Sequence, residues 1–457
     1  MIEVGNKKVM VVGMAKSGFS AARLLLKLGA RVLLYDQKPA DAFEGIQELL
    51  DAGAESRLGC DPEEVAKEAQ MLVLSPGVPV KQPFIAQAQE AGKPVISEIE
   101  LGYRAAQADF VCISGTNGKT TTTALTGQIF SDGGRHTYTL GNIGVPICDK
   151  ALETRPGDVI VAEVAALQLE TIDQFHPRAA ALLNLTEDHL NRFGTMQYYG
   201  DCKMREFENQ TAQDFAVLNL DDPLTAQRIG QIRSHLLLFS RKQEVEEGAY
   251  LKNGSIVFRM NGKEQEICPA ADVRIPGLHN LENALAAVCL SMCMGIDPKS
   301  IAHTLRTFPG VEHRIEFVRE VGGVRYINDS KGTNPDSTIK AIQTMTAPTI
   351  LILGGYDKQN TFDDMFAAFT ENIVGIVVLG ATKQKILKAA ADAGYPACRI
   401  KTADTFEQAV QSARQMAPKG GAVLLSPACA SWDMFKNFEQ RGEVFKEIVH
   451  GFEECEG

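Results

Sequence analysis

One short stretch, 111–123, constrains the chain more than any other. It reads VCISGTNGKTTTT, which is an apolar strand end, a glycine turn and the start of a helix. Glycine lets a backbone come close to a ligand, and the amides of such a turn and of the next helix N-terminus point toward an anion. Lys119 adds a positive charge, and the Thr120 hydroxyl suits Mg²⁺. The stretch therefore predicts a site for a nucleoside triphosphate.

This stretch matches the general P-loop pattern only in part. That pattern has a glycine five positions before Gly118, where this chain has Ile113, and Gly115 lies three positions before instead. The alternative is a glycine turn that begins an ordinary helix and leaves the lysine solvated. The order of strand, turn and helix favours the nucleotide site.

Length and composition set the broad class. At 457 residues the chain is too long for one hydrophobic core, and its 45% apolar and 23% charged residues are typical of a globular protein. The net charge of −11 argues against general nucleic-acid binding. The chain has no membrane-spanning apolar run and no signal-peptide core, and its ten cysteines form no Cys-x-x-Cys pair. We expect a cytoplasmic protein with reduced thiols and no structural zinc site.

The N-terminal part has the pattern of a doubly wound nucleotide-binding sheet. The expected elements are strands at 8–12, 31–35 and 71–74 and a helix at about 19–28. Ala15 replaces the middle glycine of the dinucleotide fingerprint, and Asp36 follows the second strand, where an acid often meets a ribose. A tight turn, 75–79, follows the third strand, at an edge where such sheets bind ligands. This weakened pattern fits a dinucleotide, another nucleotide or no ligand.

Polar side chains follow the strands expected in the middle of the chain. The expected elements are strands at 158–162, 179–185, 215–219 and 236–239 and a helix at 281–294. Glu163 is either a Mg²⁺ ligand or a solvated strand-end acid, and Asn142 is either a turn residue or a ligand contact. A lone histidine is commonly a core residue, but the polar surroundings of His189 favour a metal or substrate role. Lys203 reads by its spacing as an ordinary surface lysine.

A third α/β region follows the linker-like segment 309–311 and continues to the C-terminus. Its expected strands lie at 324–328, 349–353, 376–379 and 423–425. Polar loops follow three of these strands, at 329–334, 354–358 and 426–433. Because ligands bind at the carboxyl ends of parallel strands, three α/β regions with such loops predict sites that face a shared cleft.

A family resemblance covers the whole chain. The motifs that carry it are GTNGKT at 115–120, HNLEN at 279–283, NDSKGTN at 328–334, LSPACAS at 425–431 and FKNFEQRG at 435–442. The first resembles the ATP loop of the Mur ligases and their folylpolyglutamate synthase relatives. The last two, with the GNIG loop at 141–144, resemble the members of that family that add D-glutamate to UDP-N-acetylmuramoyl-L-alanine in peptidoglycan precursor synthesis.

The resemblance implies an α/β fold with three domains. These are a Rossmann-like domain for the UDP substrate at 1–104, a P-loop ATPase-like central domain for ATP at 105–310, and a Rossmann-like C-terminal domain for the amino acid at 311–457. It also implies ATP-dependent formation of a peptide bond in the cytoplasm, with Mg²⁺ as cofactor and release of ADP and phosphate. We expect a monomer whose partners are these small molecules, with no nucleic acid and no membrane insertion.

The resemblance assigns roles to individual residues, with Lys119, Glu163, His189 and Lys203 as the catalytic set. The UDP substrate would contact Ala15, Lys16, Ser17, Asp36, Gly77 and Asn142. ATP would contact Gly115, Thr116, Asn117, Gly118, Lys119, Thr120, Thr121, Asn283, Arg314 and Asp329, with Asn280 in support. D-Glutamate would contact Thr333, Lys358, Ser431 and Phe438. Mg²⁺ would be held by Thr120, Glu163, His189 and Lys203, the last as a CO₂-derived carbamate.

The implied chemistry explains why these residue types are needed. ATP would phosphorylate a carboxylate to an acyl phosphate, with Lys119 and Mg²⁺ offsetting the charge. The amine of D-glutamate would then displace phosphate through a tetrahedral intermediate, and Lys358 would pair with a D-glutamate carboxylate. His189 could instead help to remove a proton from that amine. Three substrates on three domains imply closure of the C-terminal domain.

The chain departs from the family pattern in two places. Ala165, Ala166 and Leu167 stand where the family usually has Ser-Ser-Phe, so two hydroxyl groups near the acyl phosphate are missing. Trp432, the one tryptophan, stands where a smaller apolar residue is common. The first departure bears on substrate and metal positioning and on rate rather than on the fold.

Four other functions compete with the D-glutamate ligase. Two are close, a sibling ligase that adds another amino acid and a folylpolyglutamate synthase, and the C-terminal motif disfavours both. The third is a nicotinamide-dependent dehydrogenase built on the segment 13–36, which NAD binding would support. The fourth is a nucleotide-binding regulator without activity, which the missing hydroxyl groups at 165–166 keep open.

Overall fold

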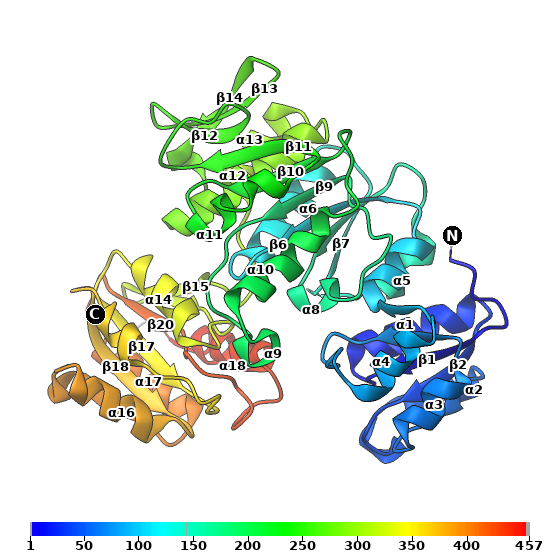
Figure 1. The fold of residues 1–457 in the computed structure, drawn as a ribbon. Helices are drawn as coiled ribbons and strands as arrows, with labels where there is room; N and C mark the ends of the chain where they lie inside the picture. The colour runs from blue at the N-terminus through cyan, green and yellow to red at the C-terminus, as the bar shows by residue number, and fades with distance from the viewer. Residues whose placement is uncertain (1, 143, 454–457) are drawn as a thin grey trace. The chain divides into compact units, whose positions relative to one another are not determined.

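Three sheets built mainly on parallel strands organise the chain in a computed structural model that describes residues 2–142 and 144–453 (Figure 1). Contacts group the chain into two compact units. The first unit covers the chain up to Arg274 together with Asn280–Phe308, and the second covers Ile275–His279 together with the chain from Pro309. The first two sheets belong to the first unit and the third sheet to the second. The predicted domain boundaries after 104 and 310 stay predictions.

The N-terminal sheet has the strand order β3-β2-β1-β4-β5, and every pair is parallel. Its strands are β1 Lys8–Val12, β2 Arg31–Tyr35, β3 Glu55–Ser56, β4 Met71–Leu74 and β5 Val95–Ser97. The helices are α1 Lys16–Lys27, α2 Ile46–Asp51, α3 Pro62–Glu68, α4 Pro83–Glu90 and α5 Glu98–Ala105. Val9 and Val11 pack into one apolar cluster and Met10 and Val12 into another, so both faces of the sheet are covered. This is the predicted doubly wound arrangement.

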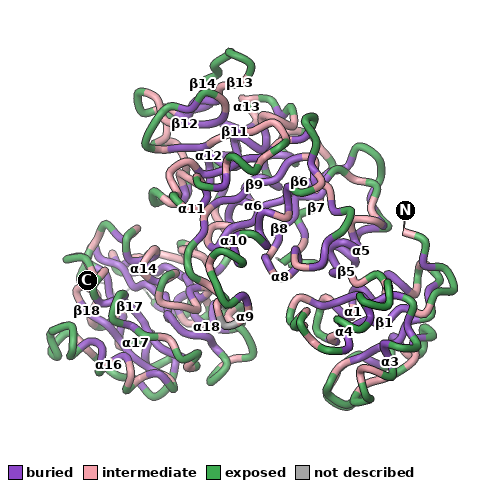
Figure 2. Tube along the Cα trace, in the orientation of Figure 1, coloured by how far each residue is buried: buried purple, intermediate pink, exposed green. Residues whose placement is uncertain are grey.

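The middle sheet has nine strands in the order β14-β13-β12-β11-β10-β9-β6-β8-β7. They are β6 Asp109–Ser114, β7 Thr137–Gly141, β8 Val159–Glu163, β9 Ala179–Leu182, β10 Phe215–Asn219, β11 His235–Ser240, β12 Gly248–Lys252, β13 Ser255–Met260 and β14 Lys263–Pro269. The helices are α6 Lys119–Asp132, α7 Ile147–Lys150, α8 Ala166–Leu169, α9 Leu190–Phe193, α10 Met196–Met204, α11 Pro223–Ala226, α12 Leu278–Cys293 and α13 Pro298–Thr307. The central strands β6, β8 and β9 are buried (Figure 2).

The third sheet has the order β15-β16-β20-β17-β18-β19, with β15 antiparallel to the parallel remainder. Its strands are β15 Glu316–Val321, β16 Val324–Asn328, β17 Thr349–Gly354, β18 Ile373–Leu379, β19 Ile400–Thr402 and β20 Ala422–Leu425. The helices are α14 Pro335–Gln343, α15 Asp363–Ala367, α16 Lys383–Asp392, α17 Phe406–Met416 and α18 Phe438–His450. β20, the last strand of the sequence, lies between β16 and β17, so three polar loops far apart in the chain leave neighbouring strands.

The structure corrects several sequence predictions. The strand predicted at 179–185 ends at Leu182, the helix predicted at 19–28 begins at Lys16, and the helix predicted at 281–294 begins at Leu278. Residues 140–141 of the predicted glycine loop are the end of β7, and Ile143 of that loop lies outside the described residues.

The antiparallel extension β12–β14 was missed although the sequence carries a signal for it. Its two turns are Asn253-Gly254 and Asn261-Gly262, and all four residues have positive φ, as a two-residue hairpin turn of this kind requires. An Asn-Gly pair between short apolar runs is therefore the sequence feature that predicts this hairpin.

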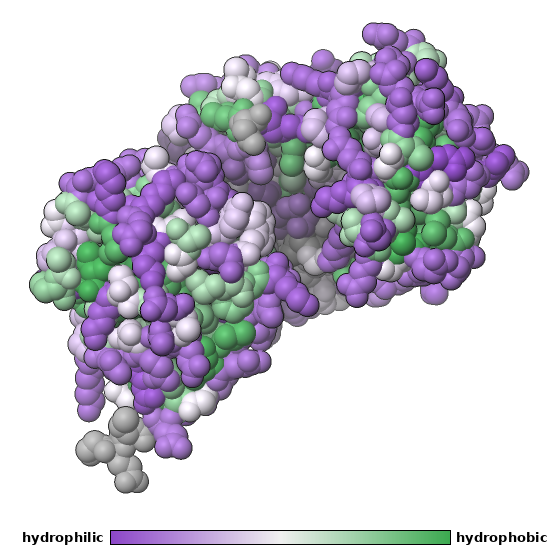
Figure 3. All heavy atoms as spheres, turned by 90° about the horizontal axis from the view of Figure 1, so that it is seen from below, coloured by the Kyte–Doolittle hydropathy of each residue, from purple (hydrophilic) through white to green (hydrophobic). Residues whose placement is uncertain are grey.

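The side chains on one face and the cysteines of the described residues agree with what the composition predicts: a hydrophilic surface and reduced thiols. Hydrophilic side chains dominate the face drawn in Figure 3, and apolar side chains lie scattered among them. The nine cysteines in the described part of the chain are free thiols, and Cys455 lies outside it. Within residues 2–142 and 144–453, no helix is both long enough and apolar enough to cross a membrane.

Candidate active site

The loop after β6 depends on its two glycines. Gly115 has φ +148° and Gly118 has φ +84°, values that favour glycine. A Cβ at Gly118 would also come within 2.4 Å of Oδ1 of Asn283, so α12 packs directly on this loop. Asn283 in turn donates from Nδ2 to Oδ1 of Asn280 at 3.1 Å. The predicted ATP-loop residues are thus held against the predicted ATP contacts of α12.

Polar contacts tie the loop to the segment after β9. Asn117 N donates to Oδ1 of Asn184 at 2.8 Å, and the Nδ2 of Asn184 donates back to the Asn117 carbonyl at 3.0 Å. The Thr116 hydroxyl donates to the Thr186 carbonyl at 3.1 Å and accepts from its amide at 3.0 Å. The loop is therefore fixed by the protein itself. Thr120 and Thr121 at the start of α6 are buried.

Two lysines converge on one carbonyl oxygen of this loop. Lys119 donates from Nζ to the Gly115 carbonyl at 2.8 Å and to the Thr116 carbonyl at 2.9 Å. Lys203, from α10, donates from Nζ to the same Gly115 oxygen at 2.8 Å and is only 1% exposed. The interpretation of Lys203 as a surface lysine was wrong, because its side chain passes under the loop and its Nζ lies 4.9 Å from the Tyr199 ring centre.

The environment of Lys203 favours an uncharged amine. Burial, and then the nearby charge of Lys119, lower the pKa of the Lys203 amine well below its ordinary value. Glu206, one turn further along, is fully buried, and neither of its carboxyl oxygens has a hydrogen-bond partner. Burial raises the pKa of Glu206 well above its ordinary value, although Lys203 opposes that rise. Sequence reasoning missed Glu206, because a glutamate after a surface-like helix gives no signal of burial.

Glu163 offers a buried oxygen that suits a metal ion. It is the last residue of β8, 3% exposed, and it pairs in register with Ile113 at the end of β6, beside the loop. Its Oε1 accepts from Nδ2 of Asn142 at 3.0 Å, whereas its Oε2 is buried without a partner. A buried carboxylate oxygen without a donor is costly unless a cation or solvent satisfies it. The residues at this strand end therefore fit a hard cation such as Mg²⁺.

The segment after Glu163 is ordered without the two hydroxyl groups that the family usually has. Gln168 accepts from the Ala165 amide at 2.8 Å through Oε1 and donates from Nε2 to Oε1 of Glu98 at 2.8 Å. Glu98, at the start of α5, is buried, and its Oε2 has no partner. Burial raises the pKa of Glu98 to about 7. Sequence reasoning did not single out Glu98.

His189 lies at the entrance of α9 with φ +53°, and its side chain is 53% exposed. Its Nε2 lies 3.7 Å from Oδ2 of Asp188. It is therefore not a core histidine. Among the contacts of the described residues, none joins it to Glu163 or Lys203, and its metal role stays a prediction.

Most residues predicted for the UDP substrate line one pocket of about 450 Å³ at the carboxyl edge of the N-terminal sheet. They are Ala15, Lys16, Ser17, Asp36 and Gly77. Asp36 accepts from the Met14 amide at 2.9 Å, which fixes the first turn against the end of β2. Gly18 is required because a Cβ there would lie 1.9 Å from the Gly13 carbonyl oxygen. Asn142 lies beside Glu163 instead, so its predicted substrate contact would be at another part of that molecule.

In the second unit, Asp329 lies in a polar cluster after β16. Its Oδ2 accepts from the Ser426 hydroxyl at 2.6 Å, and its Oδ1 accepts from the Ile315 amide at 3.2 Å. Burial raises the pKa of Asp329 to about 6, although the charge of Arg314 opposes the rise. The Nε of Arg314 is buried without a hydrogen-bond partner. The structure thus brings two predicted ATP contacts together within the second unit.

The residues predicted for D-glutamate lie on loops of the same edge. Thr333, Lys358 and Ser431 follow β16, β17 and β20, which are neighbours in the sheet, and Phe438 begins α18. Arg441, 2% exposed, joins two of these loops, because it donates to the Ser330 carbonyl at 2.7 Å and to the Cys429 carbonyl at 3.1 Å. The Ser330 hydroxyl also donates to the Phe438 carbonyl at 2.8 Å. Sequence reasoning included Arg441 in a motif but gave it no role.

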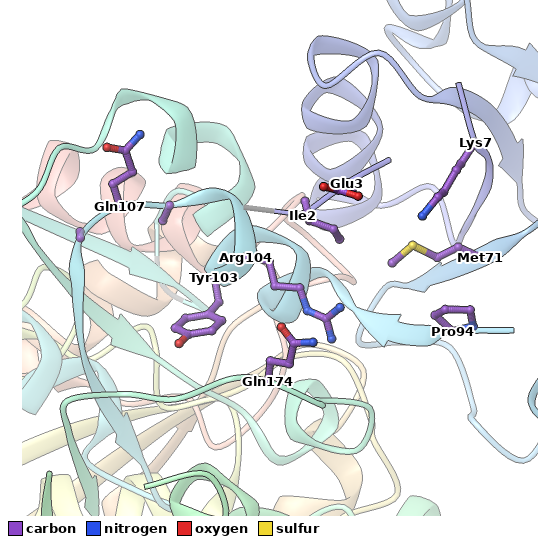
Figure 4. Close-up of a pocket in the computed structure, with 11 residues that line it drawn as sticks. Ile2, Glu3, Lys7, Met71, Pro94, Tyr103, Arg104, Gln107 and Gln174 are labelled. Carbon is purple, nitrogen blue, oxygen red and sulfur yellow. The ribbon is translucent and has the colours of Figure 1, made fainter. Parts of the chain in front are cut away.

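A cavity of about 580 Å³ has none of the predicted site residues in its lining (Figure 4). Its lining includes Lys7, Tyr103, Arg104 and Gln174. Arg104 donates to Oε1 of Glu100 at 2.5 Å and to Oδ2 of Asp173 at 2.6 Å, so two carboxylates already neutralise it. The lining gives no reason to assign a reaction to this cavity.

Three protein-family models match the chain. They are the Mur ligase MurD-like N-terminal domain over residues 7–97, the Mur ligase middle domain over 113–291 and the Mur ligase glutamate ligase domain over 313–429. The UDP-N-acetylmuramoylalanine–D-glutamate ligase of Pelotomaculum thermopropionicum is 48% identical over 97% of each chain. The protein of the same name from Caldanaerobacter subterraneus subsp. tengcongensis is 45% identical over 98% of this chain and 99% of its own.

Solved structures share the fold at low sequence identity. The UDP-N-acetylmuramate–alanine ligase of Thermotoga maritima is 17% identical, with a TM-score of 0.61 over 97% of this chain and 99% of its own. MurF of Acinetobacter baumannii is 16% identical, with a TM-score of 0.61 over 96% of this chain and 93% of its own. These likenesses agree with the three-domain α/β architecture described above.

Proposed function

The chain belongs to the Mur ligase family, and we propose that it joins D-glutamate to UDP-N-acetylmuramoyl-L-alanine in an ATP-dependent reaction. The observation that carries this proposal is the 45–48% identity, over nearly the whole chain, to curated D-glutamate ligases. Activation of the alanyl carboxylate as an acyl phosphate comes first, and attack by the amine of D-glutamate follows, with release of ADP and phosphate.

The first unit would carry out the activation. The backbone amides at 115–121 would hold the ATP phosphates, and Lys119 would leave the two carbonyls that it contacts and bind the transferred phosphoryl group. The pocket at the N-terminal sheet would hold the uridine nucleotide. Asn142 would orient the other end of that substrate beside Glu163, which it already contacts. The UDP substrate would therefore reach from the pocket at the N-terminal sheet to Glu163, and both lie in the first unit.

Thr120 and Glu163 would hold Mg²⁺, with His189 and a modified Lys203 as the further ligands. The bound ion would offset the negative charge that builds up during phosphoryl transfer. The fit rests on the buried and unpartnered Oε2 of Glu163. The backbone dipoles of the glycine loop and of α6 would also offset this negative charge.

Lys203 supports the proposed carbamate through its chemistry. Only an uncharged amine reacts with CO₂: the nitrogen lone pair forms the N–C bond, and the amine loses one proton. Burial and the charge of Lys119 both favour the uncharged form. The product would present an anionic oxygen beside Lys119 in place of a buried amine.

The second unit would bring the amino acid. Lys358 would pair with a carboxylate of D-glutamate, and Thr333, Ser431 and Phe438 would orient the rest of the molecule. Arg314 and Asp329 would contact ATP. ATP and UDP-linked precursors are cytoplasmic compounds, so the proposed reaction takes place in the cytoplasm, and nothing in the scheme needs more than one copy of the chain.

The experiment that tests this function is a panel of amino acids with UDP-N-acetylmuramoyl-L-alanine and ATP. Phosphate release is measured, and the product is identified by mass. We expect turnover with D-glutamate and a product larger by one glutamyl residue. Turnover with a different amino acid would instead support a sibling ligase, and ATP binding without turnover for any amino acid would support the non-catalytic regulator.

A further inference from the structure

The one tryptophan of the chain, Trp432, is 61% exposed and lies in the turn that follows Ser431 after β20. Tyr356 and Met434, which are 43% and 38% exposed, belong to the same loop region. A large exposed aromatic side chain gains little from folding, so its position beside the predicted amino-acid contacts calls for a physical reason.

The loops that carry these rings are fixed against each other by backbone contacts. Tyr356 pairs with Ala430 in an antiparallel bridge, and its amide donates to the Ala430 carbonyl at 2.9 Å. Gly355 makes this approach possible, because it has φ +150° and a Cβ there would lie 2.3 Å from the Ala430 carbonyl oxygen. The loop after β17 and the loop after β20 therefore form one rigid edge.

This rigid edge places two aromatic rings and a lysine together. The rings of Tyr356 and Trp432 have centroids 5.4 Å apart at an angle of 56°. The Nζ of Lys358 lies 5.2 Å from the centroid of the Trp432 ring, within the range of a cation–π contact. Tyr356 thus supports the ring from one side, and the lysine ammonium lies over it.

The nearby carboxylates make other contacts. Asp357 accepts from Nζ of Lys385 at 3.3 Å and from the Gln359 amide at 2.8 Å. Asp433 accepts from the Ala381 amide at 3.1 Å. The ring face of Trp432 contributes to holding the Lys358 ammonium.

We propose that Trp432 is a positioning residue for the amino-acid substrate: its ring holds the Lys358 ammonium where a carboxylate of a dicarboxylic amino acid binds. An ammonium over a ring face attracts the ring and still has N–H groups to donate to a carboxylate. A lysine whose flexible chain is held in this way loses less conformational freedom when the substrate arrives. This inference rests on the proposed ligase function and deepens it.

The kinetic expectation is a change confined to one substrate. Trp432→Leu should raise the KM for D-glutamate about three- to tenfold, which corresponds to the loss of a cation–π contact. The kcat and the KM values for ATP and for the UDP substrate should stay within about twofold, because those contacts lie elsewhere. Trp432→Phe keeps a ring and should recover most of the affinity for D-glutamate. A loop that had merely collapsed would not be rescued in this way.

The single tryptophan also gives a readout that needs no turnover. Its fluorescence reports on Trp432 alone, and an ammonium on the ring quenches it, so Lys358→Met should raise the emission of the ligand-free protein. Lys388→Met is the matched control, because Lys388 is exposed and pairs with Asp392 on α16. D-Glutamate, added with UDP-N-acetylmuramoyl-L-alanine and a non-hydrolysable ATP analogue, should change the emission of the parent chain and leave that of Lys358→Met unchanged.

The outcomes separate this inference from the function on which it rests. A parent chain that turns over D-glutamate, together with an unchanged KM in Trp432→Leu, would overturn the inference and leave the ligase function intact. Equal emission from Lys358→Met and the parent chain would overturn it as well. A parent chain without turnover for any amino acid would contradict the proposed function itself. The combination of a raised KM, rescue by phenylalanine and a Lys358-dependent emission supports the inference.

Discussion

The carboxyl edge of the middle sheet and the carboxyl edge of the third sheet are built on opposite principles. At the middle sheet, Lys203 and Glu163 are buried at 1% and 3% exposure, and the protein holds them in place. At the third sheet, Lys358 and Trp432 are exposed and lie on loops. The activation site therefore relies on buried side chains, whereas the amino-acid site presents exposed side chains on loops that backbone contacts hold together. Substitutions at the first edge should reduce kcat, and substitutions at the second should raise KM.

Lys119→Ala gives the largest expected effect and tests the first half of this comparison. Removal of the only lysine of the glycine loop should lower kcat about 1,000-fold or more, because the charge on the transferred phosphoryl group loses one of the cations that offset it. Phosphate release measures the rate. Lys150→Ala changes a partly exposed lysine of the same unit that pairs with Glu153, and it should keep the parental rate. A near-normal rate in Lys119→Ala would refute the assignment of ATP to this loop.

Lys203→Ala should lower kcat about 100-fold, with little change in the KM for D-glutamate. Its proposed role is to supply, as a carbamate, an oxygen ligand for Mg²⁺. A short-chain carboxylic acid should therefore restore part of the rate by supplying the missing oxygen. Lys119→Ala is the control, since the acid should give it no benefit. Full activity of Lys203→Ala without any added acid would exclude the carbamate.

Arg441→Met would break the anchoring of the second edge. The buried guanidinium joins the loops after β16 and β20, and its loss leaves the carbonyl oxygens of Ser330 and Cys429 without their donor. We expect a loss of about 4 kcal/mol in the stability of the second unit and a raised KM for D-glutamate. Thermal unfolding followed by Trp432 emission measures this unit. Lys436→Met, an exposed neighbour, serves as the control, and equal stability of the two variants would contradict the anchoring role.

Glu98→Gln tests how much the buried carboxyl group of Glu98 lowers the free energy of unfolding at neutral pH. The pKa of Glu98 is raised from 4.5 to about 7, so between those pH values the unfolded chain loses this proton while the folded chain keeps it. Stability therefore falls as pH rises from 4.5 to 7, by about 3 kcal/mol for this group. Glutamine keeps the contact with Gln168 without the charge.

Urea unfolding followed by circular dichroism at several pH values measures this difference. At pH 4 the variant and the parent chain should be about equally stable, and above pH 7 the variant should be the more stable. Equal stability of the two chains at every pH would show that Glu98 is not held in its neutral form by burial.

Much of the fold could be predicted because apolar runs and glycine turns are local signals. Strands 8–12, 31–35, 71–74, 215–219 and 324–328 were predicted to the residue. The loop at 115–120 and Glu163 were predicted for the same reason, since each directly follows an apolar strand. The hairpin β12–β14 was missed although its Asn-Gly turns are local too.

Other features depend on contacts between distant segments and leave no local signal. Lys203 lies under the glycine loop only because α10 packs there, and its helix has the composition of an exposed one. Glu98 is buried because Gln168, far along the chain, reaches it. Trp432 meets Lys358 because β20 inserts beside β17. The roles of the individual site residues remain predictions.

The central claim is that the middle sheet carries the activation of the UDP substrate and the third sheet binds the amino acid. Its most direct test is to trap the acyl phosphate in the absence of amino acid. The chain is incubated with Mg²⁺, ATP and UDP-N-acetylmuramoyl-L-alanine in the absence of amino acid and treated with borohydride, which reduces an acyl phosphate to an alcohol and releases phosphate. If the first edge activates its substrate without the amino acid, mass spectrometry of the reaction with the parent chain will find UDP-N-acetylmuramoyl-L-alanine whose terminal carboxylate has become an alcohol. The reaction with Lys119→Ala will contain none. Absence of that alcohol from a chain that turns over D-glutamate would contradict the account.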